Sequence, residues 1–135
     1  MAAARMPALV RLVLILPLTV ILSAFHAFVG WHKTMSSRQE LLKHTAWTVH
    51  LPEWLGRLVG VVEMGLVVAL LAALLRPRFS SIGVAACYGF IVLEVLSTIT
   101  HQITADGASL PQNIVSILLT AFLAWLFAQR GRATI

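Results

Sequence analysis

The sequence predicts an all-α integral membrane protein, folded as a single antiparallel four-helix bundle. Of its 135 residues, 59% are hydrophobic and only 11% are charged. A water-soluble domain of this size could not bury that much apolar surface. The apolar residues also fall into runs near the roughly 20 residues that a helix needs to cross a bilayer. These runs cover residues 7–29, 54–75, 81–101 and 110–128.

The first run carries Pro17, which kinks a membrane helix without excluding it. Arg5 and Arg11 precede the most apolar part, as basic residues do in a cleavable signal peptide. The apolar stretch is longer than the usual signal h-region of about 7–15 residues, and no clean small-x-small cleavage site follows it. We therefore interpret this run as a retained membrane helix.

The longest connection, residues 30–53, has a mixed composition that predicts a segment at the outer membrane interface. Ser37 and Glu40 have the spacing of a capping box, so we expect a short amphipathic helix to begin after Ser37. Tryptophans are placed as interfacial anchors along this segment. They are Trp31, Trp47 and Trp54.

The two remaining connections, residues 76–81 and 104–112, are short, which forces neighbouring helices to run antiparallel. Six arginines lie at the N-terminus, in the first of these turns and at the C-terminus, against four basic residues on the other side. By the positive-inside rule, we expect a multi-pass protein of the cell membrane with both termini in the cytoplasm.

The net charge of +5 does not indicate a nucleic-acid binder, because the basic residues are scattered at helix ends and form no stripe. Cys87 is the single cysteine, so there is no disulfide framework and no paired-thiol motif. We expect it to be a packing residue.

Polar and small residues align on one face of each predicted helix when they are placed on a helical wheel. Inside a membrane such residues face the bundle interior, so the four faces predict a polar pocket that opens outward. In chain order, the faces are formed by Thr19, Ser23, His26 and Gly30 with Lys33 just beyond, by Gly56, Gly60 and Glu63, by Cys87, Glu94, Thr98 and His101, and by Asn113, Ser116 and Thr120.

Two carboxyls in this pattern need an explanation, because a charge at bilayer depth costs at least about 2.5 kcal/mol. Glu63 and Glu94 lie at similar depths, so we expect them to share one cavity with His26 or His101. Near one another they would not both be ionised. Gly60 and Gly65 flank Glu63 and should allow close packing. The alternative is a structural role, in which these carboxyls and the outer Ser, Thr and Asn side chains only tie helices together.

The five histidines show no metal-ligand spacing such as His-x-x-x-His, and we expect no metal site. There is also no phosphate loop, dinucleotide fingerprint or nucleophile elbow.

Several stretches together resemble the DoxX-like family of small four-helix membrane proteins: "FVGWHKT", "LPEWLGRLVGVVEMG", "THQI" and "PQNIVSILLTAFL". The resemblance covers residues 25–125. Its family positions include Gly30, Lys33, the Pro52 to Trp54 entry, the Gly60 to Glu63 pair, His101 and Asn113, whereas Glu94 matches no family position. The resemblance implies the four-helix bundle and, through relatives linked to quinone-coupled sulfur oxidation and membrane oxidoreductase complexes, a redox setting.

The first function predicted is therefore an accessory or quinone-linked subunit of a membrane redox system, in contact with the bilayer and a redox partner. The alternative is a small intramembrane acid/base enzyme, an isomerase or cyclase acting on a lipophilic substrate. Its candidate catalytic residues are Glu63, Glu94, His26 and His101, with Lys33, Gly60, Thr98, Asn113 and Ser116 lining the pocket. The sequence leaves open the substrate, whether the chain is an enzyme and whether it forms homo-oligomers.

Overall fold

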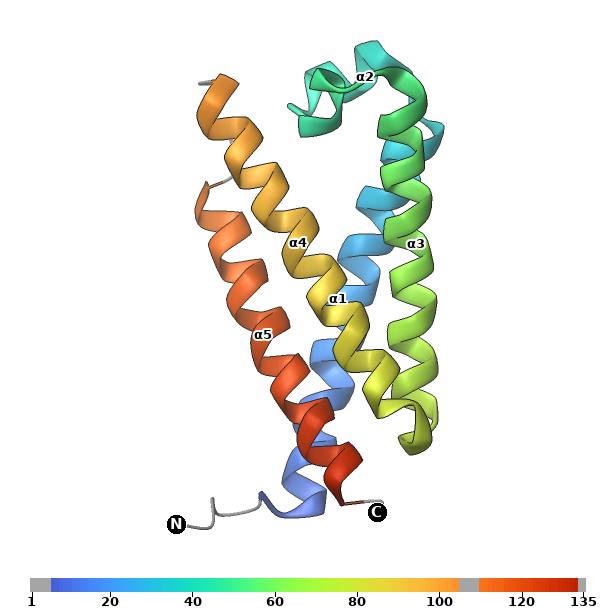
Figure 1. Ribbon diagram of the computed structural model, residues 1–135, viewed down its shortest axis with the longest axis vertical. Coiled ribbons are helices and arrows are strands. Elements are labelled where there is room, and N and C mark those ends of the chain that lie inside the picture. Colours follow the sequence, from blue (N-terminus) through green and yellow to red (C-terminus); the bar gives the residue numbers. More distant parts are fainter. Residues whose placement is uncertain (1–5, 105–109, 134–135) are drawn as a thin grey trace.

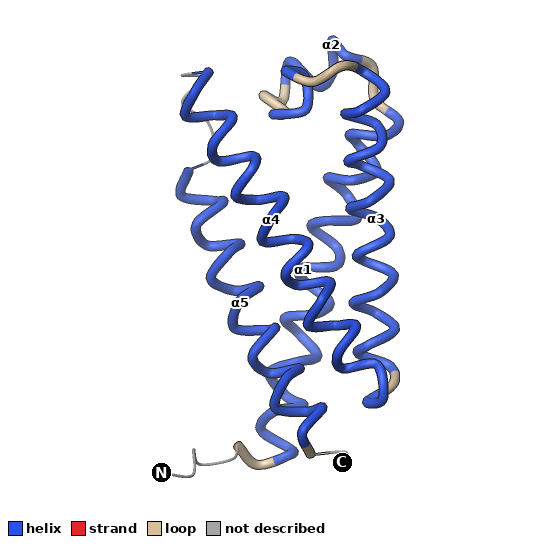
Figure 2. Tube along the Cα trace, in the orientation of Figure 1, coloured by secondary structure: helices blue, strands red, loops and turns tan. Residues whose placement is uncertain are grey.

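The computed structural model describes residues 6–104 and 110–133, and every regular element in these two ranges is a helix (Figures 1 and 2). Four helices are long. They are α1 (Ala8–Met35), α3 (Glu53–Leu75), α4 (Ser80–Thr104) and α5 (Leu110–Arg132). The shorter elements are α2 (Arg38–Lys43) and two single 3-10 turns, η1 (Trp47–His50) and η2 (Pro77–Phe79).

The long helices form an up-and-down bundle, with α1 against α3, α3 against α4, α4 against α5 and α5 against α1. Each contact in this ring joins antiparallel neighbours, as the short connections predict. The start of α1 and the end of α5 lie at one end of the bundle, and α2 lies at the opposite end (Figure 1).

All four long helices are long and apolar enough to cross a membrane. Large aliphatic and aromatic side chains remain exposed along their outer faces, among them Leu9, Val68 and Leu118. In water this surface would be unfavourable, whereas in lipid it meets a solvent of its own polarity. The chain is therefore a multi-pass membrane protein, as the sequence predicts.

The apolar core occupies the half of the bundle away from α2. Ile15, Leu70, Phe90 and Phe127 are fully buried there. Cys87 belongs to the same cluster and is fully buried, which agrees with the packing role expected for it.

Three of the long helices continue past the ends of their apolar runs, α4 from residue 101 to Thr104 and the other two by more than a turn. α1 continues from residue 29 to Met35, because the Lys33 side chain turns into the bundle instead of ending the span. α5 continues from residue 128 to Arg132, where Arg130 donates hydrogen bonds to the carbonyls of Ala73 and Leu74 at the end of α3. A cation at a helix C-terminus satisfies orphan carbonyls and favours the helix dipole.

The longest connection forms the expected short helix, and Ser37 caps it by accepting a hydrogen bond from the Glu40 amide at 3.2 Å. Only this half of the capping box forms, because the Glu40 carboxylate turns to Lys43 and His44.

The predicted tryptophan anchors do not all face outward. Trp31 and Trp54 are 56% and 67% exposed, as an interfacial anchor should be. The prediction was wrong for Trp47, which is buried with its ring 5.6 Å from the Lys33 Nζ. A cation inside the bundle draws the aromatic face inward.

α1 and α3 approach closely at two glycines. A Cβ on Gly60 would lie 2.6 Å from the Gly30 carbonyl oxygen, and a Cβ on Gly30 would lie 3.0 Å from the Gly60 carbonyl oxygen. Only glycine allows the two backbones to meet at this distance. Gly65 was expected to pack in the same way, but it faces open space.

This contact predicts different effects for alanine substitutions at Gly60 and at Gly65, which lie on different faces of α3. Gly60→Ala should separate α1 from α3 and destabilise the folded protein, because its Cβ would meet backbone that cannot rotate away. Gly65→Ala should be neutral or stabilising by up to about 1 kcal/mol, the helix-propensity difference between the residues. Thermal unfolding of both variants in detergent checks this, and equal melting temperatures for the two would contradict it.

Candidate functional site

The centre of the site is a buried ion pair between α1 and α3. Glu63, only 2% exposed, accepts from the Lys33 Nζ at 2.6 Å through Oε2. Its Oε1 lies 2.8 Å from the His26 Nδ1. Both oxygens of the carboxylate are thus held by side chains of α1.

The glycine contact explains why these side chains meet. His26 and Lys33 lie four residues before and three residues after Gly30, so they share its face of α1. Glu63 lies three residues after Gly60 on the facing side of α3. Where the two glycines bring the backbones together, Glu63 reaches between the two α1 side chains.

His26 links this ion pair to the second carboxyl. Its ring stacks on Phe90 of α4, with the ring centres 4.0 Å apart, and its Nε2 lies 3.9 Å from the Glu94 Oε1. In the described part of the chain, this buried Nε2 makes no hydrogen bond. A carboxylate accepts hydrogen bonds, so Glu63 favours the proton on Nδ1 and leaves Nε2 as an acceptor that faces Glu94.

Fewer side chains bind the Glu94 carboxyl than the Glu63 carboxyl. Ser116 of α5 donates to its Oε1 at 3.2 Å, and His26 lies on its other side. The side chain also faces a cavity. Glu94 is therefore the carboxyl that can meet a ligand while remaining in contact with His26.

Between Glu94 and the α2 end of the bundle, asparagine and hydroxyl side chains link α5 to α4 by hydrogen bonds. Asn113 donates to the Thr98 Oγ1 at 3.0 Å and to the Ser97 Oγ at 3.3 Å. Thr98 in turn donates to the Glu94 carbonyl one turn earlier. Ser97 was missed from the sequence, although its position three residues after Glu94 places it on the same face.

A cavity of about 270 Å³ lies between the long helices at the α2 end of the bundle. Glu63 and Glu94 both line it, as do Lys33, His101 and Asn113, and the aromatic side chains of Phe25, Phe28 and Trp47 contribute apolar wall. Four of the predicted site residues are not among the lining residues. His26, Thr98 and Ser116 support the wall through their contacts with the glutamates and Asn113, while Gly60 lies at the α1–α3 contact.

A comparison with protein-family models matches residues 17–125 to the DoxX-like family. The chain belongs to the DoxX-like family. The matched range contains both glutamates, His26, Lys33, His101 and Asn113, so the entire site lies within the part of the DoxX-like chain that defines its family. No curated protein and no solved structure matches the chain significantly.

The buried ion pair of this DoxX-like chain predicts strong coupling between Lys33 and Glu63. Lys33→Met or Glu63→Gln alone leaves a buried charge without its partner, a loss of about 3–5 kcal/mol of stability. The double variant Lys33→Met/Glu63→Gln removes both charges and should be more stable than the two single losses predict together. Unfolding free energies of the parent chain and the three variants, measured in detergent, give a double-mutant cycle for this pair.

The control is Glu53→Gln, which removes an exposed partner of Arg57. Such a surface pair contributes about 0–1 kcal/mol, so this variant should resemble the parent protein. The coupling would be contradicted if the double variant lost as much unfolding free energy as the sum of the losses of the two single variants.

Proposed function

We propose that the chain is a quinone-linked subunit of a membrane redox system, and that its cavity holds the head group of a lipophilic quinone. The observation that carries this proposal is a cavity of about 270 Å³ with apolar walls and two carboxyls, enclosed by helices that cross a membrane. A membrane-soluble ring with polar atoms at opposite edges suits such a site.

Polar groups lie on two sides of the cavity. Lys33 and Glu63 belong to the α1–α3 side, whereas His101 and Asn113 belong to α4 and α5. The two carbonyl oxygens of a quinone point in opposite directions, so each side can supply a hydrogen-bond donor. The aromatic side chains of Phe25, Phe28 and Trp47 provide the surface for the flat ring.

Proton supply is the second support. Reduction of a quinone to a quinol takes two electrons and two protons. Glu94 faces the cavity and lies 3.9 Å from His26, which in turn contacts Glu63 at 2.8 Å. This line of three titratable groups can hold and deliver protons, while a partner subunit in the membrane supplies the electrons.

An acid/base enzyme acting on a lipophilic substrate is the second candidate function. It is favoured by one observation, the buried position of His26 between two carboxyls. Glu94 would exchange a proton with the substrate, and His26 with Glu63 would return it to its starting form. Such an isomerase or cyclase needs no electron donor.

Quinone binding can be measured directly through Trp47, whose ring lines the cavity. Titration of the detergent-purified chain with a short-chain quinone should quench tryptophan fluorescence saturably. Quinone oxygens accept hydrogen bonds and do not donate them, so Glu94 can bond a quinone only as a protonated carboxyl. Glu94→Leu removes this donor, and loss of the hydrogen bond should weaken Kd by up to about tenfold.

Glu53→Leu serves as the matched surface control, and an alkyl chain without the quinone ring serves as the ligand control. Equal quenching by the alkyl chain without the ring, or an unchanged Kd for Glu94→Leu, would contradict the quinone proposal. Turnover of a lipophilic substrate without any redox partner would instead favour the acid/base enzyme.

We also propose that the α1 start and the α5 end face the cytoplasm of the cell, so that the cavity opens on the outer side. Arg11, Arg76, Arg78, Arg130 and Arg132 lie at that end of the bundle. The basic residues at the α2 end are Lys33, Arg38, Lys43 and Arg57. The larger number of arginines at the α1 start and the α5 end is the asymmetry on which the positive-inside rule depends.

Cysteine labelling tests this orientation. In a Cys87→Ser background, an impermeant maleimide should label Gln39→Cys on intact cells and Ser81→Cys only after permeabilisation, since both positions are exposed. The reverse pattern would place the cavity mouth on the cytoplasmic side.

A further inference from the structure

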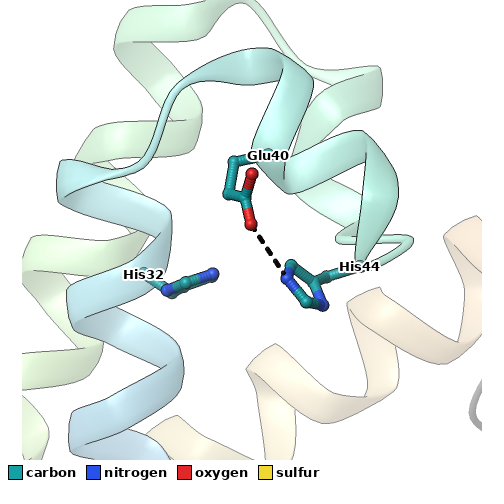
Figure 3. Close-up of side chains that lie close together, drawn as sticks. All are labelled: His32, Glu40 and His44. Carbon is teal, nitrogen blue, oxygen red and sulfur yellow. Dashed lines mark hydrogen bonds and ion pairs between the residues drawn. The ribbon is translucent and has the colours of Figure 1, made fainter.

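Three potential metal ligands gather at the outer end of the cavity (Figure 3). His32 comes from the last turns of α1, Glu40 from α2, and His44 caps the end of α2. One ligand atom from each lies within 4.8 Å of the others. Sequence spacing does not indicate this group, because Glu40 and His44 do not form a His-x-x-x-His pair and His32 lies on a different helix.

The donor set suits zinc. Two imidazole nitrogens and one carboxylate oxygen are the protein ligands of a common class of open zinc sites. Around a tetrahedral zinc ion, ligand atoms bound at about 2.0–2.1 Å lie roughly 3.4 Å from one another. The Glu40 Oε1 and the His44 Nε2 are already 3.2 Å apart, so only His32 has to move closer.

A Glu and a His four residues apart on a short helix are by themselves an ordinary surface pair. His32 distinguishes this group from such a pair. It joins the other two residues because the chain reverses direction after Met35, so that α2 lies over the end of α1. The His32 ring stacks on Phe28 with the ring centres 5.4 Å apart, and it meets the His44 ring edge-on at 5.3 Å. His32 is thereby held facing the other two ligands (Figure 3).

The nearest cation does not block the group. Lys43 contacts the other oxygen of Glu40, Oε2, at 3.4 Å. Its side chain is 73% exposed and can turn into water when a metal ion arrives.

We propose that His32, Glu40 and His44 bind one zinc-class divalent cation whose fourth coordination position opens onto the cavity. His32 and His44 line the same cavity as Glu63 and Glu94, whereas Glu40 lies outside its wall. The free position therefore faces the cavity, where it takes water or an oxygen atom of the bound molecule. The ion also fastens α2 to α1 over the cavity mouth. This site goes beyond the proposed quinone role and does not depend on it.

Zinc alone is the probe. The full chain, purified in detergent through a tag without histidine and stripped with a chelator, is titrated with Zn²⁺ in competition with a chromophoric chelator. We expect one ion per chain. His32→Ala, Glu40→Gln and His44→Ala should each raise Kd at least about tenfold, since even supporting residues of metal sites contribute 10–100-fold. Substitution with Co²⁺ should give the intense visible absorption of a four-coordinate ion, and each variant should lose it.

His50→Ala and Glu53→Gln are the matched controls, because both remove a potential ligand that lies outside the group. They should bind Zn²⁺ like the parent chain. The three ligand positions are exposed or half-buried, so their variants should melt like the parent without metal, which separates lost ligation from misfolding. The proposal is overturned if binding is absent, if the three variants keep the parent Kd, or if the controls lose as much affinity. Quinone titration of the metal-free chain tests the other proposal separately.

Discussion

The buried contact between Lys33, Glu63 and His26 depends on one backbone constraint, the approach of α1 and α3 at Gly30 and Gly60. An unpaired ion at this depth would be unfavourable by several kcal/mol. The glycines allow the two helices to come close enough for both oxygens of the carboxylate to be satisfied. The same pairing turns Lys33 inward, extends α1 to Met35 and draws Trp47 into the bundle.

In this arrangement the two glutamates have different contacts. Glu63 is bonded through both oxygens and holds helices together, so its removal should be felt first in stability. Glu94 is held by a serine hydroxyl and faces the cavity, as the proton exchange proposed for it requires. His26 connects them, with one nitrogen bonded to Glu63 and the other turned to Glu94.

The two ends of the bundle differ for a physical reason. Away from α2, a cluster of buried apolar side chains fills most of the interior. Toward α2, polar side chains from α1, α3, α4 and α5 replace them, and the space between the helices remains as a cavity. The connection with α2 and η1 supplies Leu41, His44 and Trp47 to its wall. Any small molecule in the cavity is therefore recognised by the bundle and by this connection together.

The four membrane spans, the cap at Ser37 and the family could all be predicted from the sequence, because hydrophobic run length, capping and motif order are local properties. It also indicated which helix faces are polar, since that follows from helical periodicity. Which polar groups meet became clear only from the packing of the helices. The pairing of Lys33 with Glu63, the burial of Trp47 and the approach of His32 to Glu40 and His44 each join residues on different elements. Such contacts depend on helix neighbours, axial shift and the path of the connection, which periodicity along one helix does not specify.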